Sequence, residues 1–275
     1  MNPWLETIGV ILVAVSGGIV GWLFSTSRKS RWIWGYLLPL LLIAILALAR
    51  CGNALCFIPP FSWIAAGRAK FVVLSLAVTM GLMAPMSRLP YKCEKIMLSV
   101  LMVAVVVWFS ILPFLVPALI KDNLANLETV IGSDGVCFQT KNYTCGPAAA
   151  VTALRQLGLP AQEGEIAVLS HTSPVTGTLP QCLYSALKNR YSADGLECQY
   201  RSFDSIKQLK QAGLTLVVVK DAFLRDHCVA VLAVTDTMVL MADPVTGRNV
   251  MPPEKFEKIW RFSGIVLKRD TVQSI

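Results

Sequence analysis

The apolar side chains of this 275-residue chain are concentrated in its first 120 residues. Hydrophobic residues make up 55% of the sequence and charged residues only 15%, which is too apolar for an ordinary soluble domain. Four apolar runs have about the length that crosses a bilayer, at residues 5–24, 33–49, 62–83 and 96–120. The run at 62–83 is the weakest, because it contains Arg68 and Lys70. We therefore predict an N-terminal all-α transmembrane region of about four helices over residues 1–120.

The remaining residues, 121–275, have the composition of a folded domain. The first 120 residues hold nine Lys and Arg against two Glu, and the rest hold sixteen basic against fifteen acidic residues. The net charge of +8 therefore belongs to the transmembrane region, and the folded domain is nearly neutral. A nucleic-acid-binding domain has a basic surface, so we expect no nucleic acid as a partner. The apolar runs of the first 120 residues predict that the lipid bilayer is a partner.

The basic loop residues predict the orientation of the spans. The loops after the first run and before the last run carry six basic residues between them, and the loop between the middle runs carries three at most: Arg28, Lys29, Arg31, Arg88, Lys92 and Lys95 against Arg50, Arg68 and Lys70. The first run has no basic start, so it is predicted to be a retained helix rather than a signal peptide. This places the chain as a multi-pass protein of a bacterial inner membrane, with its folded domain outside the cytoplasm.

The eight cysteines agree with that placement. Cys93 falls in a predicted cytoplasmic loop, and one further cysteine is assigned below as a nucleophile. The other six form an even set, which is typical of an oxidising compartment. Cys51 and Cys56 flank a turn and can pair; the remaining four allow three connectivities, all left open: Cys137, Cys182, Cys198 and Cys228.

The folded domain reads as helices first and strands afterwards. Helices are predicted at 145–158, 163–170 and 177–190, with Thr178 as the N-cap of the third. Strands rich in Val and Leu are predicted at 196–202, 214–220, 227–234, 238–243 and 264–269, with helices between them at 205–213 and 252–260. This layout is typical of an α+β domain with a mostly antiparallel sheet.

Three residues in this domain can form a nucleophilic site. Cys145 begins the first predicted helix, where the helix dipole favours a thiolate. His227 begins a strand, and Asp243 ends the next one, so a tight turn between the strands brings the two together. A carboxylate in that position holds the imidazole in one tautomer, and an imidazolium activates a neighbouring thiol. The alternatives are a structural thiol paired with Cys137, an ordinary strand histidine and an Asp-Pro turn.

Gln139 stands six residues before Cys145, on the loop that leads into the helix. Acyl transfer needs hydrogen-bond donors aimed at the developing oxyanion, and a Gln amide with the backbone N–H of the cysteine can supply them. The other interpretation is a solvated loop residue. His171, in a turn-rich segment, is interpreted as a loop residue, and Phe256 and Trp260 as core.

In this order, the motifs resemble those of the bacteriocin-processing, double-glycine-leader peptidases, a papain-like cysteine peptidase family. The resemblance covers residues 136–268 and is carried by Gln139, Cys145-Gly146-Pro147, Gly177-Thr178, His227, Asp243-Pro244 and Gly247. It implies a papain-like fold in which Cys145 is the nucleophile, His227 the general base and acid, Asp243 the orienting residue and Gln139 the oxyanion donor. Two departures stand out: the peptidase follows the membrane region, and Cys228 replaces an aromatic or aliphatic residue after the histidine.

We therefore expect a membrane-anchored cysteine peptidase over residues 121–275 that hydrolyses exported or membrane-associated peptides. No cofactor or metal is expected. The sequence contains no G-x-x-x-x-G-K-[ST] phosphate loop, so an export machine would be a separate partner. The alternatives are a non-catalytic peptide-binding or sensor module on the same fold, and acyl transfer to an amine instead of water.

Overall fold

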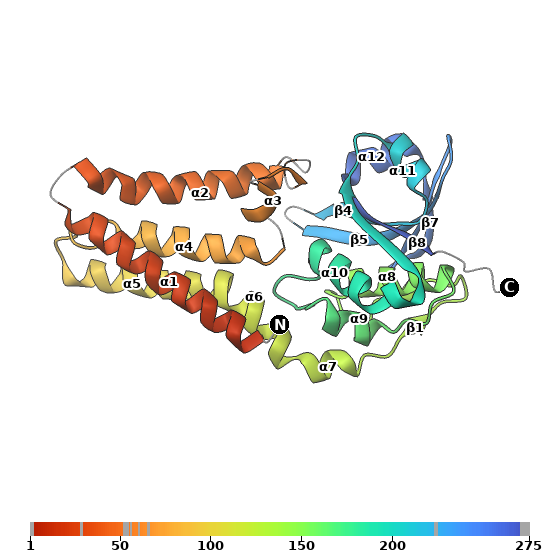
Figure 1. Ribbon diagram of the computed structural model, residues 1–275, viewed down its shortest axis with the longest axis horizontal. Helices are drawn as coiled ribbons and strands as arrows, with labels where there is room; N and C mark the ends of the chain where they lie inside the picture. Colours follow the sequence, from red (N-terminus) through yellow and green to blue (C-terminus); the bar gives the residue numbers. More distant parts are fainter. Residues whose placement is uncertain are drawn as a thin grey trace. The chain divides into compact units, whose positions relative to one another are not determined.

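The computed structural model describes residues 3–27, 30–51, 55, 57–59, 61–64, 67–222 and 225–269. The chain divides into two compact units (Figure 1). Met1–Leu119 forms a helical unit, and Ile120–Ile275 forms an α+β unit.

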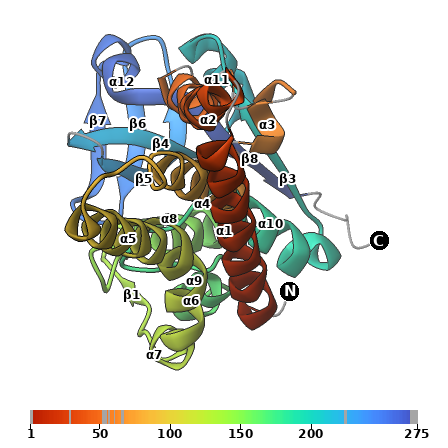
Figure 2. The same cartoon turned by 90° about the vertical axis from the view of Figure 1, so that its left-hand side faces the viewer.

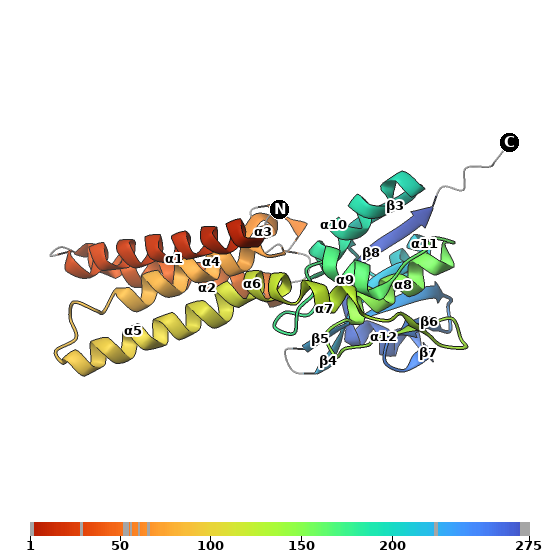
Figure 3. The same cartoon turned by 90° about the horizontal axis from the view of Figure 1, so that it is seen from below.

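Four long helices build the helical unit. They are α1 (Pro3–Thr26), α2 (Trp34–Cys51), α4 (Ala69–Met83) and α5 (Lys92–Val106), with the short elements η1 (Ser30–Ile33) and α3 (Phe61–Ile64) between them. Helix α4 packs against α1, α2 and α5, and Figure 2 shows it between them. Helix α5 continues through a π-helical turn, η3 (Val107–Ile111), into α6 (Leu112–Leu119), as Figure 3 shows. Pro113 follows that turn, and its missing N–H accounts for the break in the α-helical hydrogen bonds.

Two helical segments of the described residues are long and apolar enough to cross a membrane: Trp4–Thr26 and Lys92–Leu119. The other two long helices are shorter, at Trp34–Ala49 and Ala69–Met83. The expected run at 62–83 is interrupted, because Gly67 has a φ of 51° and α4 begins only at Ala69. Two of the four expected spans therefore have full length, and the number four stays a prediction.

Helices α1 and α4 approach each other closely at two glycines of α1. A Cβ atom on Gly21 would lie 2.5 Å from the carbonyl oxygen of Met80. A Cβ atom on Gly17 would lie 2.9 Å from the carbonyl oxygen of Leu76 and would overlap Thr79. Glycines four residues apart on one helix face let two backbones pack together in membrane proteins.

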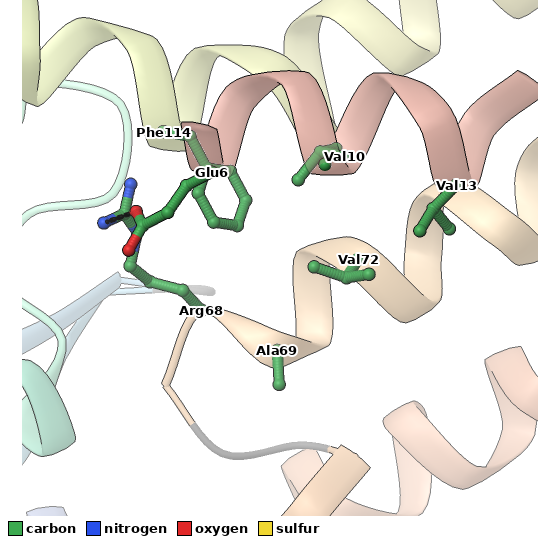
Figure 4. A pocket seen from close by; sticks show the side chains of 8 residues that line it. Glu6, Val10, Val13, Arg68, Ala69, Val72 and Phe114 are labelled. Carbon is green, nitrogen blue, oxygen red and sulfur yellow. Dashed lines mark ion pairs between the residues drawn. The ribbon is translucent and has the colours of Figure 1, made fainter. Parts of the chain in front are cut away.

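An open groove of about 400 Å³ lies on the helical unit, between α1, α4 and α6 (Figure 4). Its walls are mostly apolar, and a charged pair stands at one end: Arg68 Nη1 lies 2.6 Å from Glu6 Oε2. The Arg68 guanidinium also stacks over the Phe114 ring at 4.2 Å. Arg68 therefore pairs inside the unit at the start of α4 and does not interrupt a helix.

The α+β unit opens with its helices. These are α7 (Lys121–Ala125), α8 (Cys145–Gln156), α9 (Glu163–Leu169), α10 (Pro180–Tyr191) and the 3-10 turn η4 (Ser192–Asp194). A short hairpin of β1 (Val130–Ile131) and β2 (Cys137–Phe138) precedes α8. The N-cap of α10 is Leu179 and not Thr178. The Thr178 hydroxyl lies 2.7 Å from Thr172 Oγ1.

Six strands form one antiparallel sheet in the order β3-β8-β4-β5-β6-β7. They are β3 (Leu196–Ser202), β4 (Thr215–Ala222), β5 (Arg225–Val234), β6 (Val239–Asp243), β7 (Gly247–Met251) and β8 (Trp260–Arg269), with α11 (Ile206–Ala212) and α12 (Pro253–Ile259) in the connections. Strand β7 was not predicted, because "GRNVM" is short and mostly polar or turn-forming. The α+β fold with an antiparallel sheet is confirmed.

Both faces of this sheet are covered, and each covering layer encloses a core (Figure 1). Helices α8 and α10 pack on the face that includes Leu216 and Ala230. Helices α11 and α12 pack on the face that includes Val217 and Val229, with Phe256 and Trp260 fully buried there. Burial on both faces explains why residues 216–219 form a continuous apolar run without polar alternation.

The cysteine prediction is wrong for the part that the structure describes. Cys137, Cys198 and Cys228 each keep a reduced thiol, so none of the three connectivities expected for these residues and Cys182 is formed. Cys56 and the side chain of Cys51 lie outside the described residues.

Candidate functional site

Helix α8 places Cys145 at its first position and is anchored along its length. Every residue from Gly146 to Leu154 is buried, since the helix runs through the core on one face of the sheet. A Cβ atom on Gly146 would lie 2.8 Å from Thr178 Cβ, so only glycine allows this approach to the loop before α10. Cys145 itself is only half-buried, and the positive end of the helix dipole lies beside its sulfur.

His227 and Asp243 meet at the ends of two paired strands. Strands β5 and β6 are antiparallel neighbours, and the register pairs Ala230 with Ala242. The His227 Nε2 atom lies 2.9 Å from Asp243 Oδ1, and the two side chains are only 15% and 20% exposed. Asp243 Oδ1 also accepts a hydrogen bond from the Val245 N–H at 2.8 Å. Two contacts therefore hold this carboxylate oxygen, which in turn fixes the imidazole ring.

The Cys145 side chain also interacts with the His227 ring, and this interaction contributes to the pKa of His227. Because Nε2 is engaged by Asp243, Nδ1 is the ring nitrogen that remains for the sulfur. Burial lowers the pKa of His227, but the interactions with Asp243 and Cys145 outweigh it and raise the pKa to about 10. Burial raises the pKa of Asp243, but the bonds from His227 and Val245 outweigh that effect and lower it. At neutral pH the site therefore holds an imidazolium between an ionised carboxylate and a sulfur atom.

Cys228 packs in the core on the α8 side of the sheet, and the opposite face is covered by α11 and α12. The start of β5 therefore has covering helices on both sides. His227 is nevertheless accessible in part, because it lies near the start of β5, two residues after Arg225.

Three other thiols of the α+β unit have raised pKa values. Burial raises the pKa of Cys137 to about 12 and that of Cys198 to about 11. Burial and the charge on Cys145 raise the pKa of Cys228 well above its ordinary value. Cys228 packs against the core beside α8.

Gln139 directly follows β2, on the loop that leads into α8. Its backbone N–H donates to the carbonyl oxygen of Pro244 at 2.9 Å, which ties this loop to the residue after Asp243. The Oε1 atom of Gln139 is buried and accepts no hydrogen bond from the described residues. The predicted oxyanion donor therefore lies on a loop joined to the β6–β7 turn.

The remaining residues singled out in the sequence have other places. His171 lies in the turn after α9, with a φ of 53°, and takes no part in the His227–Asp243 pair. Gly177 has a φ of 62° and closes a tight turn by bridging Ser173. Among the described residues, no group of three or more His, Cys, Asp or Glu side chains is arranged to hold a metal ion.

Sequence reasoning missed two carboxylates near this site. Asp134 accepts hydrogen bonds from the N–H groups of Val136 and Arg248, and Glu163 Oε1 accepts from Thr140. In the sequence, Asp134-Gly135 reads as a turn and Glu163 as a solvated first-turn acid. Only the long-range contacts identify them.

Comparison with known proteins identifies the family of this chain. A sequence model described as the peptidase C39 family matches residues 134–272, just over half of the chain. An uncharacterised protein of Methanothermobacter marburgensis is 29% identical over 145 residues, which are 53% of this chain and 96% of that protein.

Two solved structures are also similar. One is the peptidase domain of Streptococcus ComA, a bifunctional ABC transporter of a quorum-sensing pathway, with a TM-score of 0.43 and 19% identity over 52% of this chain and 100% of that one. Another is a double-glycine-motif protease from an AMS/PCAT transporter in complex with its leader peptide, with a TM-score of 0.42 and 18% identity over 52% and 95%. The family match confirms the resemblance found in the motifs: this chain belongs to the peptidase C39 family and is a cysteine peptidase.

Proposed function

We propose that this chain is a membrane-anchored peptidase in which Cys145 is the nucleophile, His227 the general base and acid, and Asp243 the orienting carboxylate. The single observation that carries the proposal is the chain of contacts from Cys145 through His227 to Asp243. It joins the N-terminus of a buried helix to the ends of two strands that lie far away in the sequence.

The arrangement supports acyl transfer in two steps. The Cys145 sulfur attacks the scissile carbonyl carbon, and the His227 imidazolium gives its proton to the leaving amine. The resulting acyl-enzyme is hydrolysed by water, which His227 activates as a base. Asp243 accepts a hydrogen bond from Nε2 throughout, so the ring keeps Nδ1 toward the reacting atoms. Gln139 and the Cys145 backbone N–H stabilise the oxyanion.

The substrate is proposed to be an exported or membrane-associated peptide with small residues before the cleaved bond. The similarity to a protease described with a double-glycine motif and a leader peptide supports this class. The two helices of span length support an anchor that keeps the peptidase near the membrane. Large apolar side chains face outward on both of these helices and on α2, including Leu12, Leu40, Met97 and Trp108, which is typical of a surface that contacts lipid rather than water. An export machine is proposed as a partner.

The test uses the full chain in detergent micelles, with the p-nitrophenyl ester of N-acetyl-glycylglycine as the acyl donor. The intact protein should release a stoichiometric burst of nitrophenolate and carry a Cys145 adduct by mass spectrometry. Cys145→Ala should abolish both, whereas the matched variant Cys198→Ala should keep both. A burst that survives in Cys145→Ala would refute the assignment.

The same assay separates the alternatives. A chain that binds a glycylglycine peptide without any burst is a binding module. A chain whose acyl group transfers to added glycinamide faster than to water is an acyltransferase.

A further inference from the structure

The loop that carries Gln139 is fixed from two sides by carboxylates that do not belong to the Cys-His-Asp set. We call residues 132–141 the oxyanion loop. Only β2 gives this loop regular structure, so its position depends on side-chain contacts. An oxyanion donor must be placed within a fraction of an ångström, because catalysis depends on donors that are already oriented.

Glu163 holds the end of the oxyanion loop. Its Oε1 atom accepts hydrogen bonds from the Thr140 N–H at 3.0 Å and the Thr140 hydroxyl at 3.1 Å. Glu163 is fully buried at the start of α9, and its own N–H donates to Thr129 Oγ1 at 2.9 Å. Its second oxygen, Oε2, accepts no hydrogen bond from the described residues.

Asp134 holds the beginning of the same loop. Its Oδ1 atom accepts from the Val136 N–H at 3.1 Å, within the loop. Its Oδ2 atom accepts from the Arg248 N–H at 2.9 Å, on strand β7. Gly247 has a φ of 84°, and a Cβ atom there would lie 2.8 Å from Oδ2. Glycine at this position therefore leaves room for the Asp134 carboxylate.

The β6–β7 turn connects these contacts to the site. Gln139 donates its backbone N–H to Pro244 O at 2.9 Å, and the Val245 N–H binds Asp243 Oδ1. The turn therefore contacts both Gln139 and Asp243. Directly after the turn, Arg248 on β7 donates its N–H to Asp134, which lies in the oxyanion loop.

We propose that Glu163 and Asp134 are positioning residues that hold the Gln139 amide in register with Cys145. This inference rests on the proposed function, because it assigns the two carboxylates an effect on oxyanion stabilisation. Neither residue touches the reacting atoms. Both act through Gln139, so their effect on the burst should disappear when Gln139 is replaced. A general effect on folding should remain.

The test is a double-mutant cycle on the full chain. Glu163→Gln and Asp134→Asn are each made in the natural sequence and in Gln139→Ala. Two rates are measured: the nitrophenolate burst from the glycylglycine ester, which passes through an oxyanion, and alkylation of Cys145 by iodoacetamide, which does not. Asp236→Asn is the matched control, because Asp236 is 91% exposed and pairs only with Lys210 among the described contacts.

In the natural sequence, each substitution should slow the burst about 10-fold, since small misplacements cost one to two orders of magnitude. Alkylation should change less than about twofold. In the Gln139→Ala background, which should itself be about 100-fold slower, the same substitutions should add less than about twofold. Equal losses in both backgrounds, or equal losses of burst and alkylation, would overturn the proposal.

Two further measurements cover the cases in which a variant does not fold or the proposed function itself is wrong. If Glu163→Gln does not fold, as judged by thermal unfolding, the more exposed Asp134→Asn carries the cycle alone. A burst that persists in Cys145→Ala would instead overturn the proposed function, and so separates that failure from this one.

Discussion

The Nε2 atom of His227 lies 2.9 Å from Oδ1 of Asp243, although sixteen residues separate them in the chain. This contact sets the protonation state of the site, because the carboxylate and Cys145 together raise the His227 pKa to about 10. It also orients the ring, since Asp243 holds Nε2 and leaves Nδ1 for another partner. Three predictions concern the chemistry and stability of this site, and two concern the helical unit.

Asp243→Asn should lower the His227 pKa from about 10 toward its ordinary value of about 6.5, because the imidazolium loses its negative partner. The alkaline limb of the burst rate should therefore move to lower pH, and the rate at pH 8 should fall by about 10³-fold. The measurement is the burst rate from pH 5 to 11. An alkaline limb at the same pH in both proteins would contradict the assignment of Asp243.

The stability of the α+β unit should depend on pH through the same pair. The His227 pKa is raised in the folded state, so its stabilisation is complete below about pH 6.5 and is lost as pH rises toward 10. The Asp243 pKa is lowered, so its stabilisation is present above about pH 4 and is lost as pH falls further. Urea unfolding of the full chain should show a loss of about 2 kcal/mol between pH 6.5 and 10. His227→Gln should flatten that decline; an equally steep decline in the variant would locate the titration elsewhere.

At neutral pH, Cys145 should be more reactive than three other cysteines of the α+β unit. Cys137, Cys198 and Cys228 have raised pKa values, so they stay protonated at pH 7 and react slowly. Iodoacetamide at limiting concentration should modify Cys145 at least 10-fold faster than these three. Peptide mapping by mass spectrometry gives the order of modification directly. Modification of Cys228 before Cys145 would contradict the assignment of Cys145 as the nucleophile.

Gly21→Ala should destabilise the helical unit, because the new methyl group would overlap the Met80 carbonyl on α4. Overpacking of this kind costs about 1–3 kcal/mol. Gly9→Ala is the matched control on the same helix, since nothing lies within 4 Å of the site of its Cβ atom. Thermal unfolding in detergent should show a lower midpoint for Gly21→Ala only. Equal midpoints would mean that α1 and α4 do not pack this closely.

The orientation predicted from the basic loops can be tested on Cys93, which is exposed at the start of α5. In right-side-out membrane vesicles, a membrane-impermeant maleimide should label Cys145 and leave Cys93 unlabelled. Detergent should then make both reactive. Labelling of Cys93 in sealed vesicles, with Cys145 protected, would place the peptidase in the cytoplasm.

Local patterns predicted most of the elements of the α+β unit, because each pattern depends on neighbours in the chain. The Ala-rich segment after Cys145 became α8, and the Val-rich runs became β4, β5 and β6. Strand β7 was missed because "GRNVM" is held by pairing with β6 and not by its own composition. Thr178 was predicted to be a helix cap. Instead, its side chain packs against Gly146 and its hydroxyl contacts Thr172 Oγ1.

The sequence by itself determined the kind of residues available for catalysis: a cysteine at the head of a helix, one of only two histidines on a strand, and an aspartate at the end of the next strand. Tertiary structure alone decided which ring nitrogen binds Asp243, that both sheet faces are buried, and that Asp134 and Glu163 hold the oxyanion loop. The physical reason is the distance along the chain over which each kind of interaction acts. Propensity and periodicity act over a few residues, whereas these contacts join positions 16 to 114 residues apart, and their geometry exists only once the sheet and helices have packed.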